Sequence, residues 1–185
     1  MLRARVTAGL LVLVVLMPAV SGAPPVAASS SADINRGVDA ALARLYATVP
    51  DAKALAQRAK GVLVFPDIVK AGFLFGAQYG DGALRRRGKT VGYYNTVAGS
   101  YGLQAGVQKF GYALFFMSDS ALAYLDKSDG FEVGVGPSIV IVDSGKAVTH
   151  TTTTVQSDIY AFIFDQRGLM AGLGLQGSKI SRIER

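Results

Sequence analysis

Positive charge is concentrated between residues 85 and 89 of the sequence. Arg85, Arg86, Arg87 and Lys89 place four cations within five residues, interrupted only by Gly88. Four like charges would repel one another in a core, so we expect this run to lie in solvent. Two interpretations stay open: a contact point for the phosphates of lipid head groups, or a charged turn that keeps a sheet edge from pairing.

A second candidate set lies just before this run. Asp67 and Lys70 could form an ion pair with each other, which is worth only about 0 to 1 kcal/mol at a surface, or Lys70 could present its ammonium group to a ligand. Phe73, Phe75 and Tyr79 follow at every second or fourth position, which puts them on one face of an extended segment. The sequence therefore offers cations for head groups and aromatic side chains for an apolar contact.

Catalytic and metal-binding constellations are missing from the sequence. His150 is the only histidine and there is no cysteine, so a transition-metal site would have to combine one imidazole with carboxylates. Asp143, Ser144 and Gly145 form ordinary turn chemistry without a nucleophile elbow, and no phosphate-loop or dinucleotide fingerprint occurs. We therefore expect a protein that is not an enzyme and needs no metal or cofactor.

The elements around these residues begin with two helices. Apolar residues recur at helical spacing over residues 34–49, with Ser31 or Asp33 as the predicted N-cap, and a second short helix is predicted over residues 52–60. A third short helix is predicted to begin at Ser118 or Asp119 and to end at Lys127.

Glycine marks the strands that follow. Residues 62–65 form an apolar strand that we expect Pro66 to end, and a second strand begins at Ala71 with an aromatic face and a bare one. The bare face of this strand carries Gly72 and Gly76. Two later segments repeat such a face, one with Gly102 and Gly106 and one with Gly172 and Gly174. Glycine weakens a strand unless something approaches closely, so these pairs predict close packing or a sheet that curls toward closure.

Hairpins are predicted at Gly88 and over residues 165–168, with further short strands between them. Together these patterns predict an α+β fold: an antiparallel, β-rich sandwich or partly closed barrel with about three flanking helices.

The first residues are typical of an export signal. Arg3 and Arg5 precede the apolar run 10–17, and small residues up to Ala23 suit a cleavage site. We expect a signal peptide over residues 1–23, a linker over 24–30 and one domain over 31–185. The net charge of +6 falls to +4 without the signal, which favours anionic surfaces but does not suggest nucleic acid. A cysteine-free body is compatible with a bacterial periplasm.

The chain resembles the SYLF domain family of lipid-binding modules. The resemblance rests on three blocks in order: Ala59-Lys60-Gly61 with Phe65-Pro66, Val69 to Phe73 and Gly76; Gly99 with Gly102 to Gly106; and Asp158-Ile159-Tyr160 with Gly168 to Gly172 and Gly177. It implies a non-enzymatic domain that binds phospholipid. Eukaryotic members often bind phosphoinositides or actin, which we do not carry over to an exported bacterial chain.

We therefore expect a phospholipid-binding domain of the bacterial cell envelope, either periplasmic or peripherally associated with the outer membrane. Its predicted partner is an anionic phospholipid or membrane surface. The predicted lipid-binding residues are Lys70, Arg85, Arg86, Arg87, Lys89, Phe73, Phe75 and Tyr79. The alternative is a structural or protein-interaction domain of the envelope whose glycine-rich strands permit tight packing.

Overall fold

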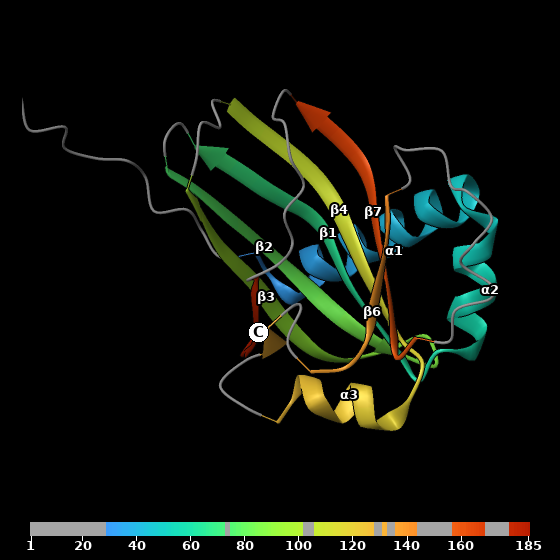
Figure 1. Ribbon diagram of the computed structural model, residues 1–185. Coiled ribbons are helices and arrows are strands. Elements are labelled where there is room, and N and C mark those ends of the chain that lie inside the picture. The colour runs from blue at the N-terminus through green and yellow to red at the C-terminus, as the bar shows by residue number, and fades with distance from the viewer. Residues whose placement is uncertain are drawn as a thin grey trace, which may run out of the picture.

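The described part of the chain forms three helices and one curved sheet. The computed structural model describes residues 29–72, 75–101, 106–127, 131–132, 136–143, 157–168 and 178–185 (Figure 1). The helices are α1 (Ser31–Thr48), α2 (Pro50–Arg58) and α3 (Asp119–Leu125). The strands are β1 (Gly61–Gly72), β2 (Phe75–Arg86), β3 (Lys89–Tyr101), β4 (Gly106–Phe116), β5 (Phe131–Glu132), β6 (Ile139–Asp143), β7 (Ile159–Gly168) and β8 (Lys179–Ile183).

The eight strands form a single sheet in the order β5-β8-β3-β2-β1-β4-β7-β6. Every described strand pair is antiparallel except β6 with β7. The sheet is strongly curved, with α1 on its convex side and α3 below one end (Figure 1). β5 and β6 lie at opposite ends of the strand order, so the sheet that the described strands form is open. The predicted α+β class with an antiparallel sheet and three helices is confirmed.

Local signals place the helices. The Ser30 side chain accepts a hydrogen bond from the backbone N–H of Asp33, so the N-cap of α1 lies one residue before the first of the predicted candidates. Pro50 stands in the first turn of α2, where its missing N–H costs no hydrogen bond. Ser118 caps α3 in the same way as Ser30, as predicted. No helix in the described part of the chain is long and apolar enough to cross a membrane.

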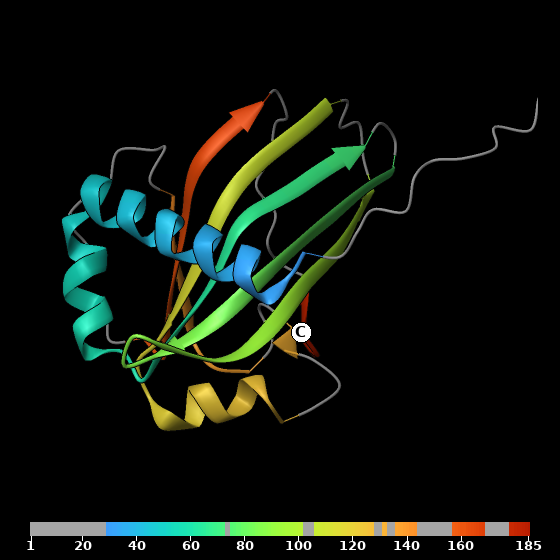
Figure 2. The same cartoon turned by 180° about the vertical axis from the view of Figure 1, so that it is seen from behind.

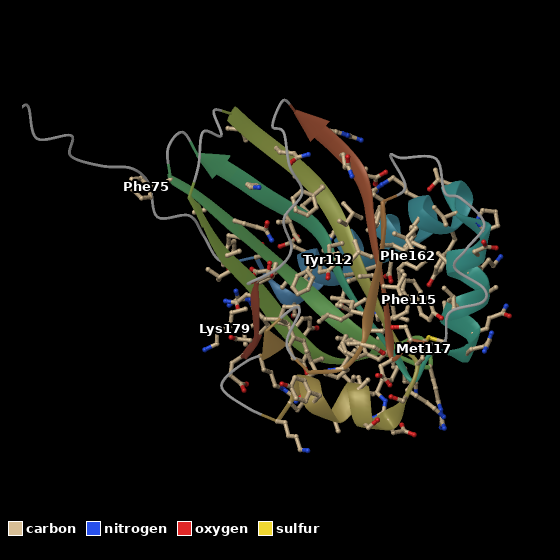
Figure 3. All side chains as sticks on the ribbon, in the orientation of Figure 1. Phe75, Tyr112, Phe115, Met117, Phe162 and Lys179 are labelled. Atoms are coloured by element: carbon tan, nitrogen blue, oxygen red, sulfur yellow. The ribbon has the colours of Figure 1, made fainter. Side chains whose placement is uncertain are left out.

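Apolar side chains cover both faces of the sheet. On the convex face, Val38 and Leu45 of α1 pack in one cluster with Phe115 and Phe162, whose rings meet edge to face at 5.2 Å. α1 runs across this face, as the view from behind shows (Figure 2). The concave face holds a second cluster, to which Tyr112 belongs (Figure 3). Both clusters are fullest at the end of the sheet where β1 begins.

β1 differs from its prediction because Pro66 does not end it. The pairing register of β1 shifts between Phe65 and Ile68 against β4, so the strand bulges at Pro66 and then continues. At a bulge, a residue without an N–H removes no bond from the ladder. β2 accommodates the bulge with glycines: a Cβ on Gly82 would lie 2.3 Å from the Val64 carbonyl oxygen, and one on Gly80 would lie 3.0 Å from that of Asp67. The predicted corner at Pro66 is therefore wrong.

The predicted second strand is divided between β1 and β2. Gly72 is the last residue of β1 and pairs with Gly76 of β2, and a Cβ on Gly72 would lie 2.4 Å from the Gly76 Cα. The bare face thus permits close approach between neighbouring strands, as the glycine pattern predicted for this pair. Phe75 and Tyr79 share one face of β2, whereas Phe73 lies outside the described residues.

A turn was also predicted wrongly over residues 165–168. β7 continues through these residues, and Gly168 pairs with Gln108 of β4. Asp165 has a φ of 54°, and the register shifts nearby between Lys109 and Gly111, so the turn-like residues mark an irregularity within a strand. Several predicted features lie outside the described residues: the predicted signal peptide over residues 1–23, and His150, Ser144, Gly145, Gly102, Gly172 and Gly174.

Candidate functional site

The basic run forms the tip of the β2–β3 hairpin, as predicted. Arg86 pairs with Lys89, and the two residues between them have positive φ, 50° at Arg87 and 77° at Gly88. Two left-handed residues in a two-residue loop are typical of a type I′ turn, whose twist matches that of the flanking strands. Arg86, Arg87 and Lys89 are exposed, so three of the four cations face solvent.

Arg85 is the exception in this run. Its side chain is only 14% exposed, and it donates hydrogen bonds to the Asp39 carboxylate at 2.7 Å and to the Asn35 backbone oxygen at 3.3 Å. Both acceptors belong to α1. Arg85 therefore fixes the hairpin to the helix, and its guanidinium is committed to that contact.

A hollow of about 700 Å³ lies between the hairpin, the end of α2 and the beginning of α3. The hairpin tip is visible between these two helices from behind (Figure 2). The lining residues are Gln57, Arg58, Ala59, Lys60, Arg86, Arg87, Val91 and Asp119. Four of these side chains are cationic and one is anionic, and the Lys60–Asp119 ion pair is long, at 3.8 Å. The hollow therefore carries an excess of positive charge that suits an anion.

A second hollow of about 430 Å³ adjoins the first and shares Gln57, Ala59 and Arg87 with it. Its other lining residues are Asp39, Leu42, Tyr46, Ala56, Gly61, Val62, Arg85 and Gly88. Much of this lining is apolar, from α1, α2 and the beginning of β1. Burial raises the pKa of the Tyr46 hydroxyl, so this group stays neutral at physiological pH. A cationic hollow thus lies beside a largely apolar one.

The remaining predicted residues lie elsewhere. Phe75 and Tyr79 are exposed by 74% and 49% in the half of β2 that lies away from the hairpin. At about 3.3 Å per residue, Phe75 lies about 35 Å and Tyr79 about 23 Å along the strand from Arg86. Lys70 is buried on the concave face. The structure therefore brings Arg86, Arg87 and Lys89 together but does not bring Lys70 or the aromatic residues to them.

Asp67 forms its ion pair with Lys109 of β4 at 2.9 Å. Both side chains of that pair are about half exposed, so the contact adds little to stability. At the same end of the sheet, the Tyr79 hydroxyl donates a hydrogen bond to Asp81 at 2.6 Å, and this bond raises the pKa of Tyr79.

Sequence reasoning missed several residues of the cationic hollow. Arg58 and Lys60 lie 25 or more positions before the hairpin, and only the packing of α2 against it brings them together. Their closeness to each other, at the junction of a predicted helix and strand, was the available signal. Across the described ranges, no group of three or more His, Cys, Asp or Glu side chains is placed to hold a metal ion.

Comparison with known families bears on the second half of the chain. Residues 97–184 match the model of the Ysc84 family, described as Las17-binding protein actin regulator. Over these residues the chain is similar to the SYLF (Ysc84) family. The predicted resemblance is thereby confirmed. No curated protein matches the chain significantly.

The SYLF match covers the end of β3 and all elements from β4 to β8. It does not include α1, α2 or the hairpin tip. The hollows are therefore argued from their geometry and charge, and the family relationship supports a lipid- or actin-associated domain in general terms.

Proposed function

We propose that this protein is a non-enzymatic domain that binds anionic phospholipids at the hollow between the hairpin, α2 and α3. The observation that carries the proposal is the cationic hollow formed by Arg58, Lys60, Arg86 and Arg87, directly beside an apolar one. A phospholipid has the same division, because its charged head group adjoins apolar chains.

The chemistry of the cations supports this choice. Guanidinium groups donate pairs of parallel hydrogen bonds to phosphate oxygens, which an ammonium group cannot do. Each Lys or Arg close to an anionic membrane contributes about 1 kcal/mol, and salt screens this contribution. Arg86, Arg87 and Lys89 protrude at the hairpin tip, where a flat surface can reach all three. We therefore propose peripheral and salt-sensitive binding.

The place of action that we propose follows from the sequence alone. Arg3 and Arg5 before an apolar run, with a small-residue cleavage site, support export. We propose a periplasmic location, or peripheral association with the outer membrane, and the envelope phospholipids as the partner. Immunoblotting of cell fractions tests this location.

A specific observation favours a second candidate, the docking of a protein partner. Five exposed apolar side chains gather at the end of the sheet opposite the hairpin: Val69, Phe75, Tyr79, Val97 and Val107. Exposed apolar groups of this kind often mark protein contacts. In this alternative the hairpin cations have a structural or protective role.

Co-sedimentation with vesicles separates the two candidates. The protein should sediment with anionic phosphatidylglycerol vesicles at low salt and remain in the supernatant with zwitterionic vesicles. Arg86→Glu with Arg87→Glu should abolish sedimentation without changing the circular dichroism spectrum. Arg167→Glu with Lys179→Glu is a matched control, since it changes the net charge equally at two exposed residues of other strands. Equal sedimentation of both double variants would refute binding at the hairpin.

A further inference from the structure

The apolar hollow lies at an incomplete edge of the convex core. Its lining includes four half-buried apolar side chains, Leu42 and Tyr46 of α1, Ala56 of α2 and Ala59 at the C-cap of α2. All four pack against the apolar cluster on the convex face, to which the lining residue Val62 also belongs. Each of these side chains has one side in the core and the other toward the hollow. The hollow therefore offers apolar surface that the protein itself does not cover.

The charges in the lining of this hollow are unevenly compensated. Asp39 and Arg85 form an ion pair at 2.7 Å, so their charges offset each other. Arg87 is the remaining charged side chain of the lining, and it also lines the cationic hollow. The uncompensated charge thus lies on the side where the two hollows adjoin. An anionic group at that border would leave the apolar part of the same molecule in the apolar hollow.

The size of the apolar hollow limits what it can hold. A methylene group takes about as much space as a water molecule in the liquid, about 30 Å³, so a volume of about 430 Å³ holds roughly 14 such groups. This is the size of one acyl chain and too small for two. The cationic hollow beside it, at about 700 Å³, has room for a polar head group.

We infer that the apolar hollow takes one acyl chain of a lipid whose phosphate lies in the cationic hollow, so that the protein holds a single lipid molecule by both parts. The inference rests on the proposed function, because the head group is the one proposed to bind at the hairpin. It goes further in that a soluble lipid with one chain should bind without any membrane. Each methylene group that moves from water into the hollow should lower the Kd about fourfold.

A series of soluble compounds that differ only in chain length tests the inference. The purified protein is titrated in a calorimeter with glycerol 3-phosphate and with lysophosphatidylglycerols that carry chains of six, eight and ten carbons, each below its micelle concentration. Glycerol 3-phosphate, which has no chain, should bind most weakly. The Kd of the others should fall about fifteenfold with every two carbons added, which is two steps of about fourfold.

Variants of the lining connect this dependence to the apolar hollow. Ala56→Phe fills the hollow, so the Kd should no longer change with chain length. If that variant does not fold, Leu42→Gln introduces a carboxamide while keeping a good helix former, and it should reduce the gain per methylene group. Ala43→Phe is the matched control, because Ala43 is exposed on α1 and lines neither hollow. Arg86→Glu should weaken every compound by about the same factor and leave the dependence on chain length unchanged.

Three results would overturn the inference: a Kd that does not depend on chain length in the wild type, a dependence that persists in both Ala56→Phe and Leu42→Gln, or a dependence that Ala43→Phe also removes. Sedimentation with anionic vesicles together with any of these results would leave the proposed function standing. Conversely, the expected dependence on chain length without sedimentation would refute the proposed membrane binding and leave a site for single lipid molecules.

Discussion

Gly82 shows how a single residue permits the fold. It lies in β2 opposite the bulge of β1, where an added Cβ would lie 2.3 Å from the Val64 carbonyl oxygen and 2.6 Å from the Phe65 ring. The first of these atoms is backbone, so it cannot move aside without disturbing the ladder. Glycine at this position therefore allows β1 to bulge around Pro66 and continue.

We predict that Gly82→Ala lowers the free energy of unfolding by about 1 to 3 kcal/mol, the usual cost of overpacking. Gly99→Ala is the matched control, because a Cβ on that glycine of β3 meets nothing within 4 Å. It should be neutral or stabilising by up to about 1 kcal/mol, since alanine restricts the unfolded chain. Urea denaturation measures both variants, and equal losses would contradict the role given to the bulge.

At Arg87, one substitution should change the stability of the fold and the proposed vesicle binding in opposite directions. It has a φ of 50° in a type I′ turn, where asparagine is favoured and arginine is not. We predict that Arg87→Asn raises the free energy of unfolding by about 0.5 kcal/mol. The same change removes one cation, which should weaken binding to anionic vesicles about fivefold, from about 1 kcal/mol per charge.

Arg87→Asn should therefore raise the free energy of unfolding measured by urea denaturation and lower the affinity measured by vesicle titration. Lys127→Asn is the control, since it removes an exposed cation just after α3 and does not change the turn. A stabilised variant with undiminished vesicle binding would show that Arg87 does not contact lipid.

At the scale of elements, Asp158 lies just before β7 and connects this strand to β6 and α3. Its carboxylate accepts hydrogen bonds from the Ser138 backbone N–H at 3.1 Å and from the Ser138 hydroxyl at 2.8 Å, just before β6. The Ser118 hydroxyl, at the N-cap of α3, donates to the other carboxylate oxygen at 3.3 Å. These bonds, led by that from the Ser138 hydroxyl, lower the pKa of Asp158 below its ordinary value of 3.8.

A carboxyl group whose pKa is lower in the folded state than in the unfolded state stabilises the fold at pH values above its ordinary pKa. This stability is lost as the pH falls through the pKa of the folded state. We therefore predict that Asp158→Asn lowers the free energy of unfolding at pH 7 and flattens its decrease below about pH 4. Urea denaturation between pH 7 and pH 2.5 measures both effects. A variant with the wild-type acid slope would contradict the bonding of Asp158 to Ser138.

Elements with local signals were predictable from the sequence. Pro50, Ser118 and the Arg87-Gly88 turn each determine their element through neighbouring residues, and all three elements were predicted. β1 and β7 were not predicted at full length, because Pro66 and Asp165 resemble turn residues, and only pairing with β4 carries each strand past them. Pairing between strands distant in sequence leaves no local pattern, so the strand order was also beyond prediction.

The candidate site was predictable only in part, for the same reason. The run of basic residues predicted that Arg86, Arg87 and Lys89 lie together, because residues that are adjacent in a hairpin tip stay adjacent in the fold. The alternation of side chains along one segment does not predict that Lys70 faces the concave core or that Phe75 lies far from the hairpin. Those placements depend on the bulge in β1 and on the antiparallel pairing of β1 with β2.

At the scale of the whole molecule, the two ends of the sheet differ in chemistry. One end carries the cationic hollow beside α2 and α3, whereas the other exposes Phe75, Val107 and their apolar neighbours. With about 35 Å of strand between them, the two ends cannot contact the same head group. The orientation of the protein on a membrane therefore follows from which end binds.

Single tryptophans distinguish the two ends, because the chain contains no tryptophan of its own. Val91 lines the cationic hollow and is 44% exposed, and Phe75 is 74% exposed at the far end, so Val91→Trp and Phe75→Trp should both fold normally. With anionic vesicles we predict a blue shift of the Val91→Trp emission and none for Phe75→Trp, since only the hairpin end approaches lipid. Salt of about 0.5 M should reverse the shift, as the Debye length then falls well below 10 Å. The opposite pattern, a salt-resistant shift of Phe75→Trp alone, would move the lipid contact to the apolar end and leave the hairpin cations to protect the sheet.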